Sequence, residues 1–209
     1  MKPFQIPLQP GEFYHIFNRG YNLFHKNDNY KLRKSDEYVS KYIQLYAYCL
    51  IPNHFHLLVT KKEFETDTKN ALKFQNAMCF EINQFRAIGK PEDEISTVFL
   101  PLFTSYVKAI NKQENRHGSR FENHFKRNVI SDTSYLTNLV FYIHSNPQML
   151  GICNDFRQYA WSSYDRILLV KPSKLKKEEV IGWFTVKSNC LSFHEQIVEF
   201  ERIKELLIE

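Results

Sequence analysis

The alternation of hydrophobic and polar positions divides the chain into short β-strands separated by helical stretches. Segments rich in β-branched and aromatic residues, with a period of two, predict strands at 13–18, 44–50, 54–60 and 125–130. Only Ile51-Pro52-Asn53 separates the second of these strands from the third. Because proline and asparagine favour turns, this break predicts an antiparallel β-hairpin.

Apolar residues at helical spacing predict helices at 28–42, 67–86 and 99–112, and the polar segment 89–94 predicts a surface loop. Ser131-Asp132-Thr133 supplies side chains that cap helix N-termini, so a further helix is expected to begin at about Ser134. The resulting order, β-α-β-β-α-β, resembles a ferredoxin-like α+β sandwich with an antiparallel sheet.

The length of 209 residues favours one domain with an appended part. The apolar fraction of 43% and the aromatic fraction of 15% indicate a globular chain. The segment 171–179 is charged and contains Pro172, which indicates a linker, and a helical tail is predicted at 193–208. We therefore expect one domain at 1–170, followed by a linker and helical tail at 171–209.

The sequence also argues against membrane insertion and secretion. It has no run of about 18 apolar residues and no apolar N-terminal stretch, so neither a membrane span nor a secretory signal is expected. The cysteines are scattered without a CxxC pair, which argues against a zinc knuckle or a disulfide framework and fits a reducing cytosol: Cys49, Cys79, Cys153 and Cys190.

The net charge of +5 is mild, but its distribution is uneven. Basic residues outnumber acidic ones between positions 108 and 128, and Phe121 and Phe125 lie among them. Such a segment suits phosphate contacts combined with stacking on bases or sugars, although a solvated loop face fits the charge equally well. The basic residues of this segment are Lys108, Lys112, Arg116, Arg120, Lys126 and Arg127.

His54 and His56 are separated by one bulky residue at the start of the third predicted strand. Successive strand side chains point to opposite faces, so both imidazoles should lie on one face while Phe55 and Leu57 point into a core. Two imidazoles on one face make half of a divalent-metal site. Taken alone, such a pair more often consists of hydrogen-bonded structural histidines than of metal ligands.

The predicted helix from about Ser134 places Tyr142 and Asn146 one turn apart, beside the apolar stripe that should face the sheet. A metal held by the sheet would meet both side chains there, which indicates a metal-assisted tyrosine nucleophile. The alternatives are that Tyr142 is a packing aromatic and that Asn146, which precedes Pro147, ends the helix. The stripe consists of Leu136, Leu139, Val140 and Ile143.

The segment 49–59, which contains His54-Phe55-His56, resembles the HUH motif (His, bulky hydrophobic, His) of single-tyrosine DNA transposases. Further segments resemble the REP-associated branch of that family, in matching order across roughly residues 12 to 165: 14–20, 118–127, 142–147 and 161–164. The histidine pair is shared with relaxases and replication initiators, whereas the Tyr-Ile-His-x-Asn-Pro stretch at 142–147 is more discriminating.

The resemblance implies an HUH-type fold and a reaction on DNA. His54, His56 and Asn146 correspond to the ligands of Mg²⁺ or Mn²⁺, and Tyr142 corresponds to the nucleophile. Cleavage of single-stranded or hairpin DNA would give a 5′-phosphotyrosine and a free 3′-hydroxyl, from which the strand can be rejoined. The residues expected to contact DNA are Arg19, Arg116, Arg120, Lys126 and Arg127.

Two other functions fit the same pattern. A domesticated relative would bind a DNA hairpin without cutting it, and a replication initiator or relaxase would usually be a longer chain. For the transposase we expect a cytoplasmic, nucleoid-associated protein, either a monomer or a homodimer. The sequence leaves open whether Tyr142 acts with the histidines of its own chain.

Overall fold

The computed structural model describes residues 8–20, 43–62, 111–112, 115, 117–118 and 125–195. The helices predicted at 28–42 and 67–86, most of that at 99–112, and the loop at 89–94 lie outside the described residues, as does the chain after residue 195. Within the described ranges, no helix has the length and apolar character needed to cross a membrane.

The core of the fold is an antiparallel sheet in the order β2-β3-β1-β4. Its strands are β1 (Phe13–Arg19), β2 (Ile43–Ile51), β3 (His54–Lys61) and β4 (Lys126–Ile130). All four match the strands predicted from alternation, and β2 and β3 form the expected hairpin. The α+β class, with β1 between β3 and β4 as in a ferredoxin-like sheet, is therefore confirmed.

The helix predicted from about Ser134 is present as α4 (Leu136–Met149), preceded by a 3-10 turn at Thr133–Tyr135. The Asp132 side chain accepts a hydrogen bond of 2.9 Å from the Ser134 N–H, as expected of an N-cap. Pro147 lies inside the helix, and the Leu150 N–H still donates to the Asn146 carbonyl. Asn146 is thus a helical residue and does not end the helix.

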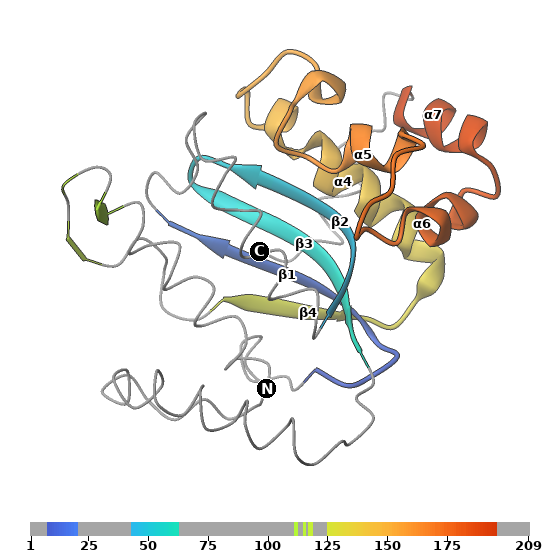
Figure 1. Cartoon of the computed structure of the whole chain (residues 1–209), viewed down its shortest axis with the longest axis horizontal. Coiled ribbons are helices and arrows are strands. Elements are labelled where there is room, and N and C mark those ends of the chain that lie inside the picture. The colour runs from blue at the N-terminus through green and yellow to red at the C-terminus, as the bar shows by residue number, and fades with distance from the viewer. Residues whose placement is uncertain are drawn as a thin grey trace.

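Helix α4 packs on one face of the sheet, against β2 and β3, and Figure 1 shows the other labelled helices on the same side. Its stripe is fully buried there with Cys49 and Leu58. The opposite face has its own core, which includes Tyr14, Phe55 and Val59. The side chains of β3 therefore divide between two cores, and His54 and His56 belong to the face that α4 covers.

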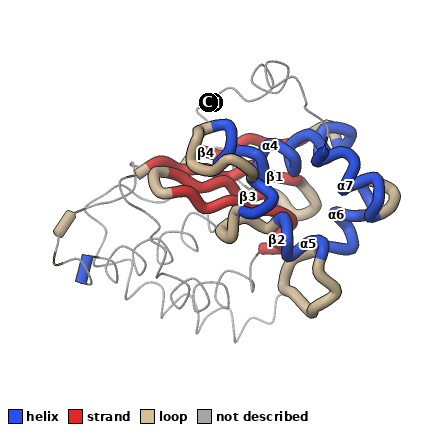
Figure 2. Tube along the Cα trace, turned by 90° about the horizontal axis from the view of Figure 1, so that it is seen from above, coloured by secondary structure: helices blue, strands red, loops and turns tan. Residues whose placement is uncertain are grey.

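The C-terminal part of the described chain packs against the same core. It contains a 3-10 turn at Phe156–Gln158 and the helices α5 (Tyr164–Leu168), α6 (Lys177–Trp183) and α7 (Lys187–Glu195), which lie to one side of the strands in Figure 2 as well. Helix α6 begins inside the predicted linker, and α7 begins earlier than the predicted tail helix. The reason is that Val180 and Cys190 are buried in the core, although charged neighbours in the sequence make their segments look solvent-exposed.

This C-terminal part also covers the outer edge of β2. The Leu50 N–H donates to the Trp161 carbonyl at 2.9 Å, and the Lys176 N–H donates to the Leu45 carbonyl at 3.0 Å. An edge strand offers unpaired backbone groups, and these contacts satisfy part of that edge. The domain boundary at residue 170 stays a prediction.

Candidate functional site

The His54 and His56 side chains lie side by side at the start of β3, on the face toward α4. Their ring centroids are 5.0 Å apart, with the rings nearly perpendicular. Phe55, between them, is buried in the opposite core. Strand alternation thus places the histidines as expected, and only the packing of α4 determines that they are buried beneath a helix.

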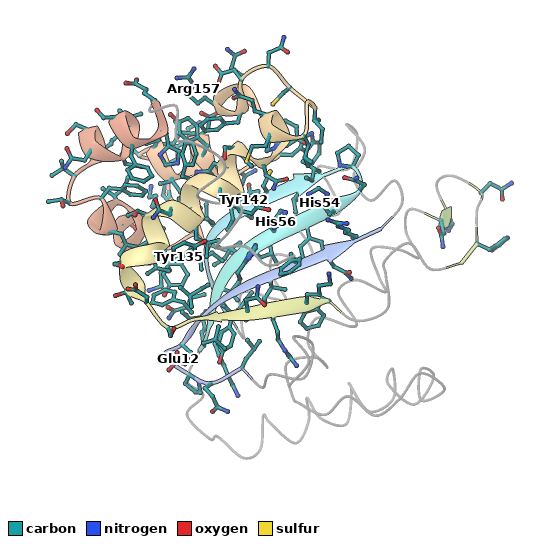
Figure 3. All side chains as sticks on the ribbon, turned by 180° about the vertical axis from the view of Figure 1, so that it is seen from behind. Glu12, His54, His56, Tyr135, Tyr142 and Arg157 are labelled. Carbon is teal, nitrogen blue, oxygen red and sulfur yellow. The ribbon has the colours of Figure 1, made fainter. Side chains whose placement is uncertain are left out.

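Helix α4 brings Tyr142 to these histidines (Figure 3), and it also carries Asn146 to His54. The Asn146 Oδ1 atom is 3.0 Å from His54 Nε2, and the Tyr142 ring lies edge-on to His56 with centroids 5.4 Å apart. Both side chains are almost entirely buried. The structure therefore gathers at one point the four residues that the sequence singled out, from segments about ninety positions apart.

The contacts of His54 are informative because each of its ring nitrogens faces an amide oxygen. His54 Nδ1 is 2.8 Å from Asn53 Oδ1, and Nε2 is 3.0 Å from Asn146 Oδ1. A neutral imidazole carries one N–H, so it can donate to only one of these oxygens. If Nδ1 donates to Asn53, then a lone pair on Nε2 faces Asn146 Oδ1, unless the Asn146 amide presents its NH₂ group instead. Two facing lone pairs are stabilised by a shared cation.

A third histidine, His15 on β1, adjoins this group. Its Nε2 atom is 2.9 Å from His56 Nδ1, and the two rings stack with centroids 5.1 Å apart. Sequence patterns do not assign His15 a role, because its strand is separated from β3 in the chain and only the pairing of β1 with β3 brings it here. Its position on an alternating strand was the one signal available.

Burial disfavours the charged form of His15 and His56. It lowers the pKa of His15 to about 3. Burial, together with the nearby charges of His15, His54 and Arg19, also lowers the pKa of His56 well below its ordinary value. A metal ligand must offer a lone pair, so neutral imidazoles of this kind are competent to bind a cation.

Two nitrogens in this group are buried without a hydrogen-bond partner, His56 Nε2 and His15 Nδ1, as far as the structure describes the chain. A buried polar atom in this state is unusual and calls for an explanation. A cation held by His56 Nε2, His54 Nε2 and Asn146 Oδ1 would explain the first of them. Adjacent ligands of a six-coordinate Mg²⁺-sized ion are about 3 Å apart, which fits the observed separation of His54 Nε2 and Asn146 Oδ1.

The described part of the chain contains no group of three or more histidine, cysteine or acidic side chains that could hold a metal. The candidate set is instead two imidazoles and one amide. These are nitrogen and oxygen ligands without a thiolate, so they suit a divalent cation that does not require sulfur ligands.

The predicted DNA-contacting residues divide into separate places. Arg19, exposed at the end of β1, pairs in register with His54. Lys126 pairs with Phe17 on the same face of the sheet as the histidines, and its Nζ atom is 5.6 Å from the Phe17 ring centroid. Arg127 points to the other face, where it is buried against Phe125, and the structure does not bring it to the site. Arg116 and Arg120 lie outside the described residues.

Comparison with known proteins gives a result for the fold. No family model matches the chain, and no curated protein matches it. A solved structure described as a REP-associated tyrosine transposase bound to a REP hairpin is similar, with a TM-score of 0.58 and 13% sequence identity. The alignment covers 80% of this chain and 86% of that one. At this identity the likeness establishes that the two chains share a fold.

Proposed function

We propose that the protein is a DNA strand-transferring enzyme of the single-tyrosine type, which cleaves and rejoins single-stranded or hairpin DNA through Tyr142. The observation that carries the proposal is the convergence of Tyr142, His54, His56 and Asn146 between β3 and α4. The shared fold with a transposase that was solved with a DNA hairpin adds support.

The proposed metal ligands are His54 Nε2, His56 Nε2 and Asn146 Oδ1, and the proposed cation is Mg²⁺ or Mn²⁺. When bound, such an ion polarises the scissile phosphate and neutralises the charge that develops on it. Asn53 supports the proposed ligand His54: its side-chain oxygen lies at hydrogen-bond distance from His54 Nδ1 and, by accepting a hydrogen bond there, favours the tautomer with a lone pair on Nε2.

The role of Tyr142 is nucleophilic attack. Its phenolic oxygen would form a bond to the phosphorus of the scissile phosphate, which stays attached to the 5′ oxygen. The bond from that phosphorus to the 3′ oxygen breaks, and the 3′ oxygen leaves as a hydroxyl. The phosphodiester is conserved in the tyrosine ester, so the strand can be rejoined without an external energy source. Packing of α4 through Leu139 and Ile143, and edge contacts of the Tyr142 ring with His56 and His15, hold the nucleophile in one place.

DNA would approach along the rim formed by Arg19 and Lys126, the basic residues on the same face as the histidines. Such residues contribute to phosphate binding and not to the chemical step. Arg127 has no part in this proposal because it is buried on the opposite face.

The test is the covalent adduct between protein and DNA, read on a denaturing gel with a labelled, hairpin-bearing oligonucleotide. Wild type should form the adduct with Mg²⁺ or Mn²⁺, whereas Tyr142→Phe should form none and still bind the DNA. Tyr46→Phe is the matched control: Tyr46 is buried in the same core, but its hydroxyl contacts Gln44 and Thr60 away from the site.

Two outcomes would contradict the proposal. An adduct formed by Tyr142→Phe would show that another residue is the nucleophile. Hairpin binding by wild type without any adduct, across the palindromic sequences that flank its gene, would favour a binding protein that does not cut.

A further inference from the structure

His15 contacts the proposed ligand His56 without being a proposed ligand itself. It lies on β1, two positions before Phe17, which is the residue that pairs directly with His56 on β3. Its ring contacts those of Phe17 and His56, with centroids 4.9 Å and 5.1 Å away, and these two rings also contact each other, with centroids 5.9 Å apart. His15 is thus fixed in place by packing, with 1% of its surface exposed.

The hydrogen bond between His15 Nε2 and His56 Nδ1 is 2.9 Å long and contains one proton. If His15 donates that proton, neutral His56 carries its own proton on Nε2 and cannot bind a cation through that atom. If His56 donates from Nδ1, then Nε2 holds a lone pair. The direction of this single bond therefore decides whether His56 is a ligand.

We propose that His15 is a positioning residue: by accepting the Nδ1–H of His56, it holds that imidazole in the tautomer whose Nε2 faces a divalent cation. The inference rests on the proposed function, because it assigns His15 a purpose only if His56 binds a metal. It also accounts for a buried histidine pair in which His56 Nε2 has no hydrogen-bond partner among the described residues.

The competing explanation is that His15 only fills space beside Phe17 and His56. The two explanations differ in what a substitution must preserve. A packing role requires a side chain of suitable volume, whereas a positioning role requires an acceptor near the position of His15 Nε2. Glutamine supplies such an acceptor in its amide oxygen at a similar reach, and leucine fills similar volume without one.

The experiment compares wild type, His15→Leu, His15→Gln and His54→Ala by Mn²⁺ titration, with free Mn²⁺ measured by electron paramagnetic resonance in the absence of DNA. Loss of a partner that orients a metal ligand typically weakens metal affinity by about 10- to 100-fold. We expect a loss of that size for His15→Leu and recovery to within about threefold of wild type for His15→Gln. Thermal unfolding of the metal-free proteins should show His15→Leu to be no less stable than His15→Gln.

The outcomes separate this inference from the proposed function. Wild-type affinity in His15→Leu, with weakened binding in His54→Ala, would overturn the role of His15 and leave the metal site intact. Equal weakening in His15→Leu and His15→Gln would also overturn it, because an acceptor at this position would then fail to restore Mn²⁺ binding. If wild type and His54→Ala bound Mn²⁺ equally, the metal site would fail, and the role of His15 would fail with it.

Discussion

Two buried histidine pairs in this protein look alike but are connected differently. His15 and His56 approach to 2.9 Å between β1 and β3, and His144 and His194 approach to 3.0 Å between α4 and α7. The ring centroids are 5.1 Å and 5.2 Å apart. Every one of these rings is almost fully buried, and burial lowers the pKa of each.

The His144–His194 pair belongs to a complete chain of hydrogen bonds. His194 Nδ1 lies 2.7 Å from the Cys190 carbonyl, which can only accept, so His194 donates there and accepts at Nε2 from His144 Nδ1. His144 Nε2 then accepts from the Ser163 hydroxyl at 2.8 Å. Ser163 Oγ in turn accepts from the Tyr48 N–H at 2.9 Å. Each ring nitrogen has a partner, and the direction of every bond is fixed.

The His15–His56 pair has no such closure, because one nitrogen of each ring is left without a partner among the described residues. Burial and a shifted pKa are common to both pairs, so neither property identifies a functional histidine here. The nitrogen without a partner is the property that distinguishes the two pairs. The closed pair, His144 and His194, links α7 and the start of α5 to α4, the helix that carries Tyr142. The open pair, His15 and His56, faces that tyrosine.

The largest expected effect comes from making the same substitution in both histidine pairs, which tests whether they differ in metal binding and in stability. His56→Leu should lose Mn²⁺ affinity by more than about 100-fold, since a ligand matters more than an orienting partner, and should cost about 1 kcal/mol of stability. His144→Leu should keep Mn²⁺ affinity within about threefold and lose about 3 kcal/mol, because Ser163 and His194 are left unsatisfied. Urea denaturation and Mn²⁺ titration measure the two effects. Similar losses in both variants would remove the distinction.

The pH dependence of stability tests the neutrality of the closed pair. Burial lowers the pKa of His194 to about 4, from an ordinary value of 6.5. Below pH 6.5, His194 therefore binds a proton in the unfolded chain, but in the folded chain it binds one only below about pH 4. Stability is lost as the pH falls through this window. Between pH 7 and pH 5, this group should contribute a loss of about 2 kcal/mol.

The control for this effect is His194→Gln, which does not titrate but can still accept from His144 and donate to Cys190. Urea denaturation at both pH values should show a smaller acid destabilisation for this variant than for wild type. Identical pH dependence would mean that His194 does not resist protonation in the folded state.

The other end of the closed chain can be opened at Ser163. Ser163→Ala removes the donor to His144 Nε2 and the acceptor of the Tyr48 N–H, so stability should fall by about 1.5 kcal/mol. Ser162→Ala is the matched control, because this equally buried serine accepts only a longer bond of 3.3 Å from the Tyr164 N–H. A loss in Ser162→Ala as large as that in Ser163→Ala would contradict the importance of the chain.

The smallest expected effect is on the salt dependence of DNA binding, and it concerns the basic residues on the surface near each histidine pair. Arg19→Ala and Lys126→Ala, beside the open pair, should each reduce the salt dependence of hairpin binding by about 0.9 in logarithmic slope per lost phosphate contact, or about 0.7 for single strands. Arg157, near the closed pair, is exposed and paired with Asp155 at 2.8 Å, and Arg157→Ala should leave the slope unchanged. Filter binding at several salt concentrations decides this. An equal change in all three variants would place the DNA elsewhere.

Local patterns predicted the elements that lie closest to the chemistry. Alternation in β3 places His54 and His56 on one face, and helical spacing places Tyr142 and Asn146 one turn apart. The same alternation implies that Lys126 and Arg127 point to opposite faces, but only the pairing of Phe17 with Lys126 determines which of the two lies beside the site. The basic segment therefore does not present one uniform surface, because Arg127 is buried on the face opposite Lys126.

The sequence by itself determined the strand and helix periods, and with them the relative orientation of neighbouring residues, because these depend on backbone geometry alone. Tertiary structure decided the partners: His15 reaches His56 through strand register, and His144 reaches His194 through the packing of α7 on α4. Such contacts join residues 41 and 50 positions apart. They depend on how faces are buried against one another, which a local period cannot specify, and they are what separates a histidine with an open nitrogen from one whose hydrogen bonds are complete.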